Sequence, residues 1–366
     1  MRALAPAGLA LLAVLCGACA QRGTLITRSA VWPSKVPTPL PSDTPTPTPP
    51  PMRTVKARGG DCLWNLSRRW LGTGFRWPEI AQANHLMRPW TIAAGQALQI
   101  PPSGPKPKAS PVDFAREEAR RYGWVQQSNR AYTVGEKLTF AVQYGGLTAG
   151  YATLSIPEVL TLDGRPVFHI VAEARSLPFF DAFFRVHDIL DSYSDVDYGF
   201  SWGYEKHIRE GGFKADASYN YDQRRGLILE PAKGTQAFLP PRSQDVLSCF
   251  YYFRTQPMTV GSVVDIPVTA DDMKNYRLTV NVLRKERVST LAGDFDCVVV
   301  QPHLSFKGVF RQKGDVFLWI SDDERRLPVL IRSRIIIGSI NINLQNAQWV
   351  RTETGAVNEQ AKGKGH

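Results

Sequence analysis

The sequence predicts an α+β protein, in which a small βααβ module precedes a large, mainly antiparallel β domain, a curled sheet or barrel with one or two helices. Three observations support this fold class. The chain has 366 residues, of which 43% are hydrophobic, enough for one small and one large core. Proline-rich stretches at 32–51 and 101–107 divide it. Short runs of alternating apolar residues fill the region beyond 130. The predicted parts are a leader (1–19), a Pro/Thr-rich linker (20–52), a module (53–101), a second linker (102–112), the β domain (113–351) and a disordered tail (352–366).

The N-terminus has the pattern of a signal peptide. Arg2 precedes an apolar run at 3–14 that is too short to span a bilayer, and small residues stand directly before Cys19. These residues resemble the cleavage box of bacterial lipoproteins, which implies that Cys19 becomes an acylated anchor. Cys16 stands where that box usually carries Leu, and the alternative is cleavage near Ala20 that releases a soluble protein. We expect export to the periplasm, with anchoring to the outer membrane as a lipoprotein.

Composition narrows the partners and the thiol chemistry. The formal charge of +11 suits anionic polymers, membrane surfaces or nucleic acid, and export excludes nucleic acid. Nine of the twenty residues at 32–51 are proline, which favours a semi-rigid polyproline II spacer of roughly 60 Å. Beyond the leader lie three cysteines in an oxidising compartment, Cys62, Cys249 and Cys297, so at most one pair forms. Cys249 and Cys297 share a predicted domain and are the better candidates for such a pair.

Residues 53–101 read as β, α, α, β. A strand at 53–57 runs into a glycine turn, where Asp61 can cap the next helix. That helix has an apolar stripe at i, i+3 and i+7 from Leu63, and a second helix covers 77–84. A strand at 97–100 is stopped by proline.

Short motifs accompany these elements: Val55-Lys56, Gly60-Asp61-Cys62-Leu63-Trp64, Trp77-Pro78-Glu79-Ile80, Ala83-Asn84 and Gly95-Gln96-Ala97-Leu98-Gln99-Ile100-Pro101. Together they resemble the LysM peptidoglycan-binding module. In that family N-acetylglucosamine units lie in a shallow groove between the loop after the first strand and the loop before the second. The resemblance therefore implies two facing walls, the first formed by Gly60, Asp61, Cys62 and Leu63 and the second by Ile92, Ala93, Ala94 and Gly95.

The chemistry of such loops suits an acetamido sugar, because backbone amides and small apolar side chains meet its N–H, C=O and methyl groups. Cys62 replaces the usual Thr of the family, and Ala94 its usual Pro. The alternative is a module that keeps this fold without a ligand.

The β domain is predicted from its strand-like runs. A short helix at 113–121 precedes strands at 138–144, 151–156, 167–174, 185–193, 204–209, 215–221, 263–269, 276–283, 297–302, 316–320, 328–337 and 341–349. The apolar segment 246–254 suits a helix that plugs or crosses the sheet. Further motifs are Gly150-Tyr151, Gly293-Asp294-Phe295-Asp296-Cys297, Trp319-Ile320-Ser321-Asp322-Asp323, Arg326-Leu327-Pro328-Val329 and Ile337-Gly338-Ser339-Ile340. Together with the helical insertion at 246–254, these motifs resemble the bacterial family named domain of unknown function 3108, over about 132–349. That resemblance implies an antiparallel β domain in exported proteins and brings no catalytic residues.

No catalytic constellation is predicted. Residues 199–203 match the G-x-S-x-G hydrolase pattern, but a strand-like segment follows where a helix is required, so Ser201 is expected to be a turn residue. The histidines lack metal-ligand spacing, and we expect no metal and no cofactor. The leading hypothesis is a non-catalytic envelope protein that binds peptidoglycan and presents its β domain for scaffolding, assembly or ligand binding.

Two alternatives remain. One is a wall hydrolase with an unrecognised active site. The other is a periplasmic lipid-binding barrel with a possible lipid or envelope-protein partner, suggested by the aromatic segment 179–184, although these side chains are more simply expected in the core.

Overall fold

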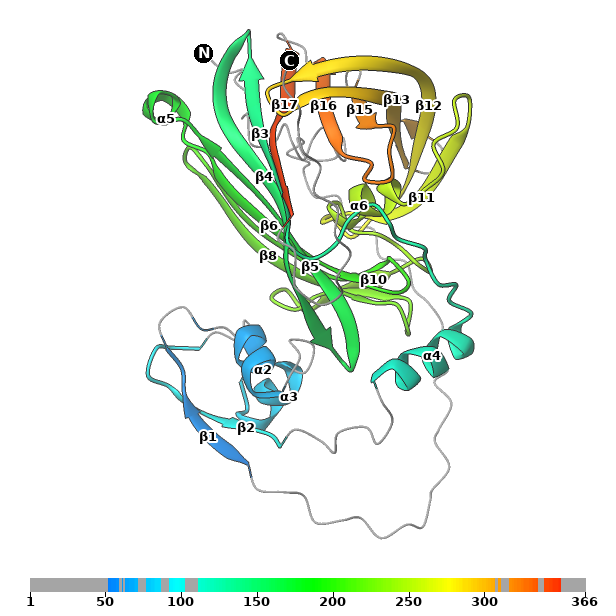
Figure 1. Cartoon of the computed structure of the whole chain (residues 1–366). Helices are drawn as coiled ribbons and strands as arrows, with labels where there is room; N and C mark the ends of the chain where they lie inside the picture. The colour runs from blue at the N-terminus through cyan, green and yellow to red at the C-terminus, as the bar shows by residue number, and fades with distance from the viewer. Residues whose placement is uncertain are drawn as a thin grey trace. The chain divides into compact units, whose positions relative to one another are not determined.

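The computed structural model describes residues 52–58, 61, 63–71, 77–86, 92–102, 111–306, 309–310, 316–334 and 339–349. They fall into two compact units, an N-unit (52–102) and a β unit (111–349) (Figure 1). The predictions for the leader, for Cys19, for the linker up to residue 51, for Gly60 and Cys62, and for the C-terminal tail lie outside the described residues. No helix of the described part is long and apolar enough to cross a membrane.

The described elements of the N-unit are β1 (Arg53–Lys56), α2 (Leu63–Leu71), α3 (Trp77–Ala83) and β2 (Ala97–Ile100). β1 pairs with β2 in antiparallel fashion, with Arg53 opposite Ile100. Leu66, Ile80 and Leu98 are fully buried between the helices and this ribbon. Asn84 joins the two layers, because its amide donates to the Gln99 carbonyl (2.7 Å) and accepts from the Gln99 N–H (2.6 Å).

The β unit is built on one antiparallel sheet, with fifteen strands among the described residues. They are β3 (Glu136–Tyr144), β4 (Leu147–Leu162), β5 (Arg165–Ser176), β6 (His187–Asp195), β7 (Ser201–Glu210), β8 (Phe213–Asp222), β9 (Leu227–Glu230), β10 (Thr235–Phe238), β11 (Val263–Thr269), β12 (Asn275–Thr290), β13 (Gly293–Phe306), β14 (Val309–Phe310), β15 (Val316–Ser321), β16 (Pro328–Arg334) and β17 (Ser339–Trp349). The helices are α4 (Pro111–Tyr122), α5 (Pro178–Phe184) and α6 (Ser248–Arg254).

The sheet is curled and not closed. Its order runs from β10 through β3 and β17 to β11, so β10 and β11 are its two edges. Side chains connect the two edge regions where no strand ladder does: the Tyr221 hydroxyl donates to the Thr269 carbonyl (2.6 Å), and the Asn275 amide to the Phe238 carbonyl (2.9 Å). Of the predicted alternatives, a curled sheet is confirmed and a closed barrel is not.

The inner face of the curl holds the core. Along β5, Phe168, Ile170 and Ala172 are buried, while the residues between them are partly exposed. The same alternation occurs in β3, β4 and β17, as a period of two requires when one face is covered. The apolar alternation read from the sequence therefore sets the register of the sheet.

α6 lies against the inner face and is buried on nearly every side (Figure 1). The predicted helical insertion is confirmed. Its last residue, Arg254, forms a fully buried ion pair with Glu136 of β3 (2.7 and 2.8 Å). The same guanidinium donates to the carbonyls of Ala131, Arg325 and Arg326 (3.0–3.1 Å), so one side chain ties α6 to β3 and to two connecting segments.

Three helices, and not one or two, accompany the described sheet. The unpredicted one is α5, which has no buried residue. The expectation that the segment 179–184 belongs to the core was therefore wrong. Pro178 at the first helical position fixes φ for a helix start, and consecutive aromatic residues give no period that would reveal it.

Candidate functional site

In the N-unit the two predicted loops lie side by side. The Ala57 N–H donates to the Gln96 carbonyl (2.9 Å), and the Gly95 N–H donates to the Ala57 carbonyl (2.7 Å). The second loop is also held internally, because the Gln96 side chain accepts from the Ala93 N–H (2.9 Å). These bonds join the residue after β1 to the loop before β2. That the two implied walls themselves face each other stays a prediction.

Asp61 organises the first loop. Its carboxylate accepts from the Arg58 N–H (2.8 Å) and from both terminal nitrogens of Arg69 (3.0 and 3.3 Å). The backbone N–H of Arg58, followed by the Arg69 guanidinium, lowers the pKa of this carboxyl group. Asp61 is thus engaged within the unit, and a ligand would meet its backbone more readily than its carboxylate.

The other described residues of the two implied groove walls differ in how exposed they are. Ala93, Ala94 and Gly95 are exposed, and Ile92 is half-buried. Gly95 has φ +83°, a left-handed conformation that lets the loop turn. Leu63 is only 5% exposed, so its side chain belongs to the core of the unit, where it opens the apolar stripe of α2. Its place in the groove wall stays a prediction.

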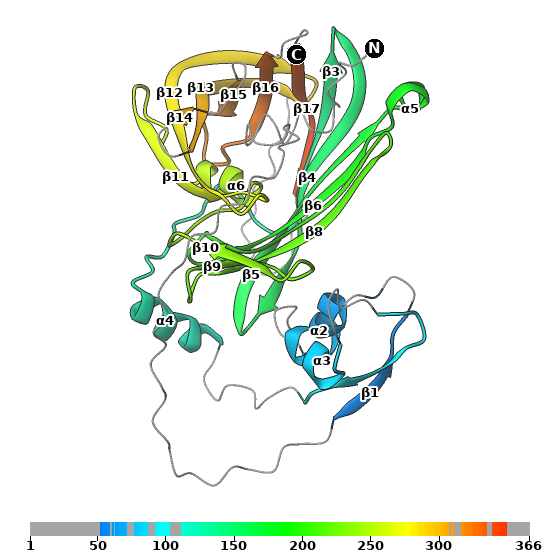
Figure 2. The ribbon, with the colours of Figure 1, turned by 180° about the vertical axis from the view of Figure 1, so that it is seen from behind.

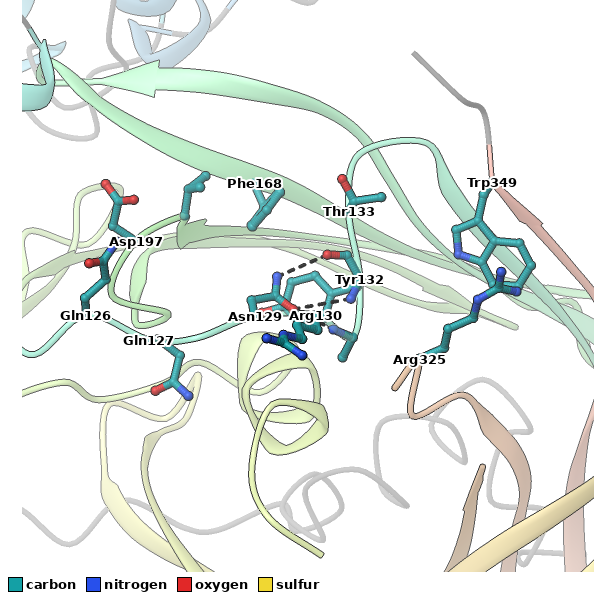
Figure 3. A pocket seen from close by; sticks show the side chains of 12 residues that line it. Gln126, Gln127, Asn129, Arg130, Tyr132, Thr133, Phe168, Asp197, Arg325 and Trp349 are labelled. Carbon is teal, nitrogen blue, oxygen red and sulfur yellow. Dashed lines mark hydrogen bonds between the residues drawn. The ribbon is translucent and has the colours of Figure 1, made fainter. Parts of the chain in front are cut away.

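In the β unit a second candidate site is an open pocket of about 450 Å³ (Figure 3). It is lined by Gln126, Gln127, Asn129, Arg130, Ala131, Tyr132, Thr133, Phe168, Val196, Asp197, Arg325 and Trp349. The segment 126–133 carries no motif that predicts a role for it. Its only signal was a group of amide side chains outside any predicted element.

The pocket has a rigid floor and a polar rim. Asn129 folds its segment back, since its side chain accepts from the Ala131 N–H (3.0 Å) and donates to the Tyr132 carbonyl (3.1 Å), as Figure 3 shows. Tyr132 is buried under the guanidinium of Arg254, and burial raises the pKa of its phenol. On the rim, the Arg325 guanidinium lies 4.1 Å from the Trp349 ring centre. Amides, guanidinium groups and ring faces suit a polar or anionic ligand.

Ser201 does not form a nucleophile elbow. It is the first residue of β7, it is fully buried, and the chain continues as a strand to Glu210. The expectation of a turn residue was therefore wrong in detail: the turn ends at Gly199 (φ +69°), two residues earlier. The Ser201 hydroxyl donates to the Gly203 carbonyl (3.4 Å), within its own strand.

The candidate disulfide is not formed. Cys249 and Cys297 are both free and buried. Cys249 lines a small apolar void with Val300 of β13, and Cys297 lies three residues before Val300, where strand alternation directs its side chain to the other face. Burial raises the pKa of the Cys297 thiol to about 12.

The described histidines of β5, β6 and β7 contact carboxylates on the sheet. His169 lies between Glu158 (3.3 Å) and Asp191 (2.7 Å), and His207 lies beside Asp216 (2.8 Å). Among the described residues there is no group of three or more side chains arranged to hold a metal ion.

Comparison of the sequence with models of protein families identifies the family of this chain. The family model described as "Protein of unknown function (DUF3108)" matches residues 139–345. The chain belongs to this family. The resemblance inferred from the motifs is confirmed, and the DUF3108 region covers β4 to β16 with most of β3 and β17. No curated protein matches the chain.

Among solved structures, the chain is similar to a β-barrel-like protein of domain of unknown function DUF1849 from Brucella abortus, with 8% identity and a TM-score of 0.43, over 60% of this chain and all of that one. It is also similar to a "putative lipoprotein" from Parabacteroides distasonis, with 11% identity and a TM-score of 0.28, over 59% of this chain and 95% of that one.

Proposed function

We propose that this DUF3108 protein is a non-catalytic component of the bacterial envelope that binds peptidoglycan through its N-unit. The observation that carries the proposal is the pair of adjoining loops, joined at Ala57 and Gly95 and exposing Ala93 and Ala94. Their resemblance to LysM assigns them an N-acetylglucosamine-containing glycan. Small exposed residues leave the loop backbone accessible to an acetamido group, which supports this ligand class.

Retention of the full chain on insoluble peptidoglycan tests this function. Ala93→Glu adds a charged, bulky side chain to an exposed loop position, and we expect it to weaken retention about tenfold, because a polar sugar contact is blocked. Gln82→Glu adds the same charge at an exposed residue of α3 and is expected to bind as the unmodified chain does. Equal retention of the two variants would contradict the assignment.

The proposal extends to location and to the β unit. The apolar leader and the lipoprotein-like box around Cys19 support export and anchoring to the outer membrane. The polar pocket between the segment 126–133 and Trp349 supports a ligand-binding role for the β unit. The apolar void below α6 measures about 20 Å³, room for about one water molecule, so it gives no support to the lipid-carrying alternative.

A further inference from the structure

Five phenylalanine side chains gather at one end of the long strands of the β unit. We name this group the aromatic tip: Phe179, Phe180, Phe183 and Phe184 of α5 and Phe213 at the start of β8. Figures 1 and 2 both show α5 at the end of the strands, away from α6 and the core. The tip therefore combines two segments that are separated in the sequence by β6 and β7.

Three of the five rings of the aromatic tip face water, and those of Phe180 and Phe184 are half-buried. Phe179 is 70% exposed, Phe183 is 77% exposed and Phe213 is 58% exposed. On α5 the rings contact one another, with centres 5.3 Å apart for Phe179 and Phe180 and 5.8 Å apart for Phe179 and Phe183. Isolated exposed apolar residues are common, but a cluster of exposed aromatic rings marks an interaction surface.

The tip is preformed. Phe184 packs over Gly211, where a Cβ would approach its ring to 2.9 Å, and Gly211 has φ +55°. The Leu177 N–H donates to the Ala149 carbonyl of β4 (2.9 Å), and Ser176 donates to Asp181 within α5. These contacts fix α5 to the ends of the neighbouring strands, so binding would not require the helix to become ordered first.

The charge around the tip is positive. Arg185 follows α5 directly, and Lys214 follows Phe213; both are exposed, and neither is in an ion pair with a residue of the described ranges. Asp181 is the acidic residue of α5, and Ser176 contacts it. Exposed Arg175 is balanced by Glu173. Aromatic rings bordered by unpaired basic side chains are complementary to an anionic lipid surface, where the rings enter the headgroup boundary and the cations meet phosphates.

We propose that the aromatic tip docks the β unit on a bilayer surface containing anionic phospholipid. Phe179 and Phe183 enter the interface, and Arg185 and Lys214 contact the headgroup phosphates. This contact is separate from the glycan contact of the N-unit, and it adds a second attachment to any lipid at Cys19.

Co-sedimentation with vesicles tests the proposal. The full chain carries Cys19→Ser throughout, so that an acyl group contributes nothing. Vesicles of phosphatidylcholine alone are compared with vesicles that also contain phosphatidylglycerol. We expect binding to the anionic vesicles, and a loss of at least about tenfold for Phe179→Ser with Phe183→Ser. The matched control Leu291→Ser removes another exposed apolar side chain (81% exposed), in the β12–β13 turn, and is expected to bind normally.

A charge variant tests the headgroup contact. Lys214→Glu is expected to weaken binding to anionic vesicles about fivefold or more, and Lys137→Glu, an exposed lysine on β3, to leave it unchanged. Phe179→Trp with Phe183→Trp keeps large rings at the interface and should retain binding. This aromatic pair and Lys214→Glu still decide the question if the serine variants fail to fold.

Three results would overturn the proposal. The first is equal binding to neutral and anionic vesicles. The second is anionic binding that the Ser pair and Lys214→Glu leave intact in folded protein. The third is a dimer in sedimentation velocity that the Ser pair dissociates, because the tip would then be an interface between copies of the chain. Each result is independent of peptidoglycan retention, which none of these variants alters.

Discussion

At the scale of single residues, the β unit depends on buried polar side chains with well-defined partners. Asp245 is fully buried before α6, where it accepts from the N–H groups of Leu247 and Ser248 (2.7 Å each) and from the Ser192 hydroxyl (2.6 Å). These bonds satisfy helix donors that would otherwise be unpaired. Burial nevertheless raises the pKa of this carboxyl group above its ordinary value of 3.8, since the charged form is desolvated.

The raised pKa of Asp245 predicts a particular dependence of stability on pH. The folded protein holds this proton more tightly than the unfolded chain, so the contribution is complete below pH 3.8 and is lost as pH rises through the folded-state pKa. Asp245→Asn keeps an acceptor for α6 and removes the ionisation. We expect the free energy of unfolding of the unmodified chain to decrease relative to Asp245→Asn as pH rises above 3.8, measured by urea titration at several pH values. Parallel pH profiles would show that burial of this charge costs nothing.

At the scale of elements, α4 is attached to the sheet by an ion-pair network under aromatic rings. Glu118 accepts from Arg165 of β5 (2.8 Å) and from Arg224 (2.6 Å), and Arg165 also donates to Asp195 (2.9 Å). The Arg165 guanidinium lies 4.9 Å from the Trp124 ring centre. The helix is therefore positioned by one carboxylate that bridges Arg165 and Arg224.

Replacing Glu118 is expected to loosen α4. Glu118→Ala should lower the free energy of unfolding by about 1.5–3 kcal/mol, because Arg165 and Arg224 lose their charge-assisted hydrogen bonds to this carboxylate. Glu117→Ala removes the adjacent, exposed carboxylate and should change stability by less than about 0.5 kcal/mol. Urea denaturation measures both, and hydrogen exchange localises the effect to α4. Equal stabilities would mean that the ion pairs of Glu118 contribute nothing to the stability of the fold.

Most elements of the fold could be predicted because their signals are local. Alternation gave β11 with its observed bounds, Val263–Thr269, and the centres of the other long strands. Bounds were less accurate where register shifts interrupt the period, as between Ser155 and Glu158 in β4. The short strands β9 and β10 were missed, since four residues carry too little pattern.

The candidate sites were predictable only where a family motif marked them. The loop residues of the N-unit were predicted from a family motif, whereas the burial of Leu63 became apparent only in the structure. The β-unit pocket joins 126–133 to Trp349, a pairing of distant segments that no local pattern encodes. Likewise, the aromatic run of α5 gave the wrong expectation, because composition does not tell whether a ring faces the core or the solvent.

At the scale of the β unit, the curl depends on contacts between the edge regions of an open sheet. Tyr221 of β8 donates its hydroxyl to the Thr269 carbonyl of β11, and Ser243 contacts the Thr269 hydroxyl (2.7 Å). Neither edge strand pairs with the other among the described residues. Unpaired edges invite pairing with other chains, so these connections protect the sheet as well as bend it.

Removing one connection should weaken the curl measurably. Tyr221→Phe leaves the buried Thr269 carbonyl without this donor, at an expected cost of about 1–2 kcal/mol and a fall in Tm of about 2–6 °C. Tyr151→Phe, at a half-exposed ring of β4, should leave Tm unchanged. Scanning calorimetry distinguishes the two. An unchanged Tm for Tyr221→Phe would indicate that water replaces the lost hydroxyl.

The pairing of β3 with β17 in the middle of the sheet has a consequence for biosynthesis. Gln143 and Asn343, which share a side-chain hydrogen bond across this ladder, are 200 residues apart. While the chain is being made, β3 can form its hairpin with β4, but its other edge stays unpaired until β17 has been made. The two halves of the sheet can therefore join only after β17 has been made, and during that interval an incomplete chain presents an open central strand to aggregation and to chaperones.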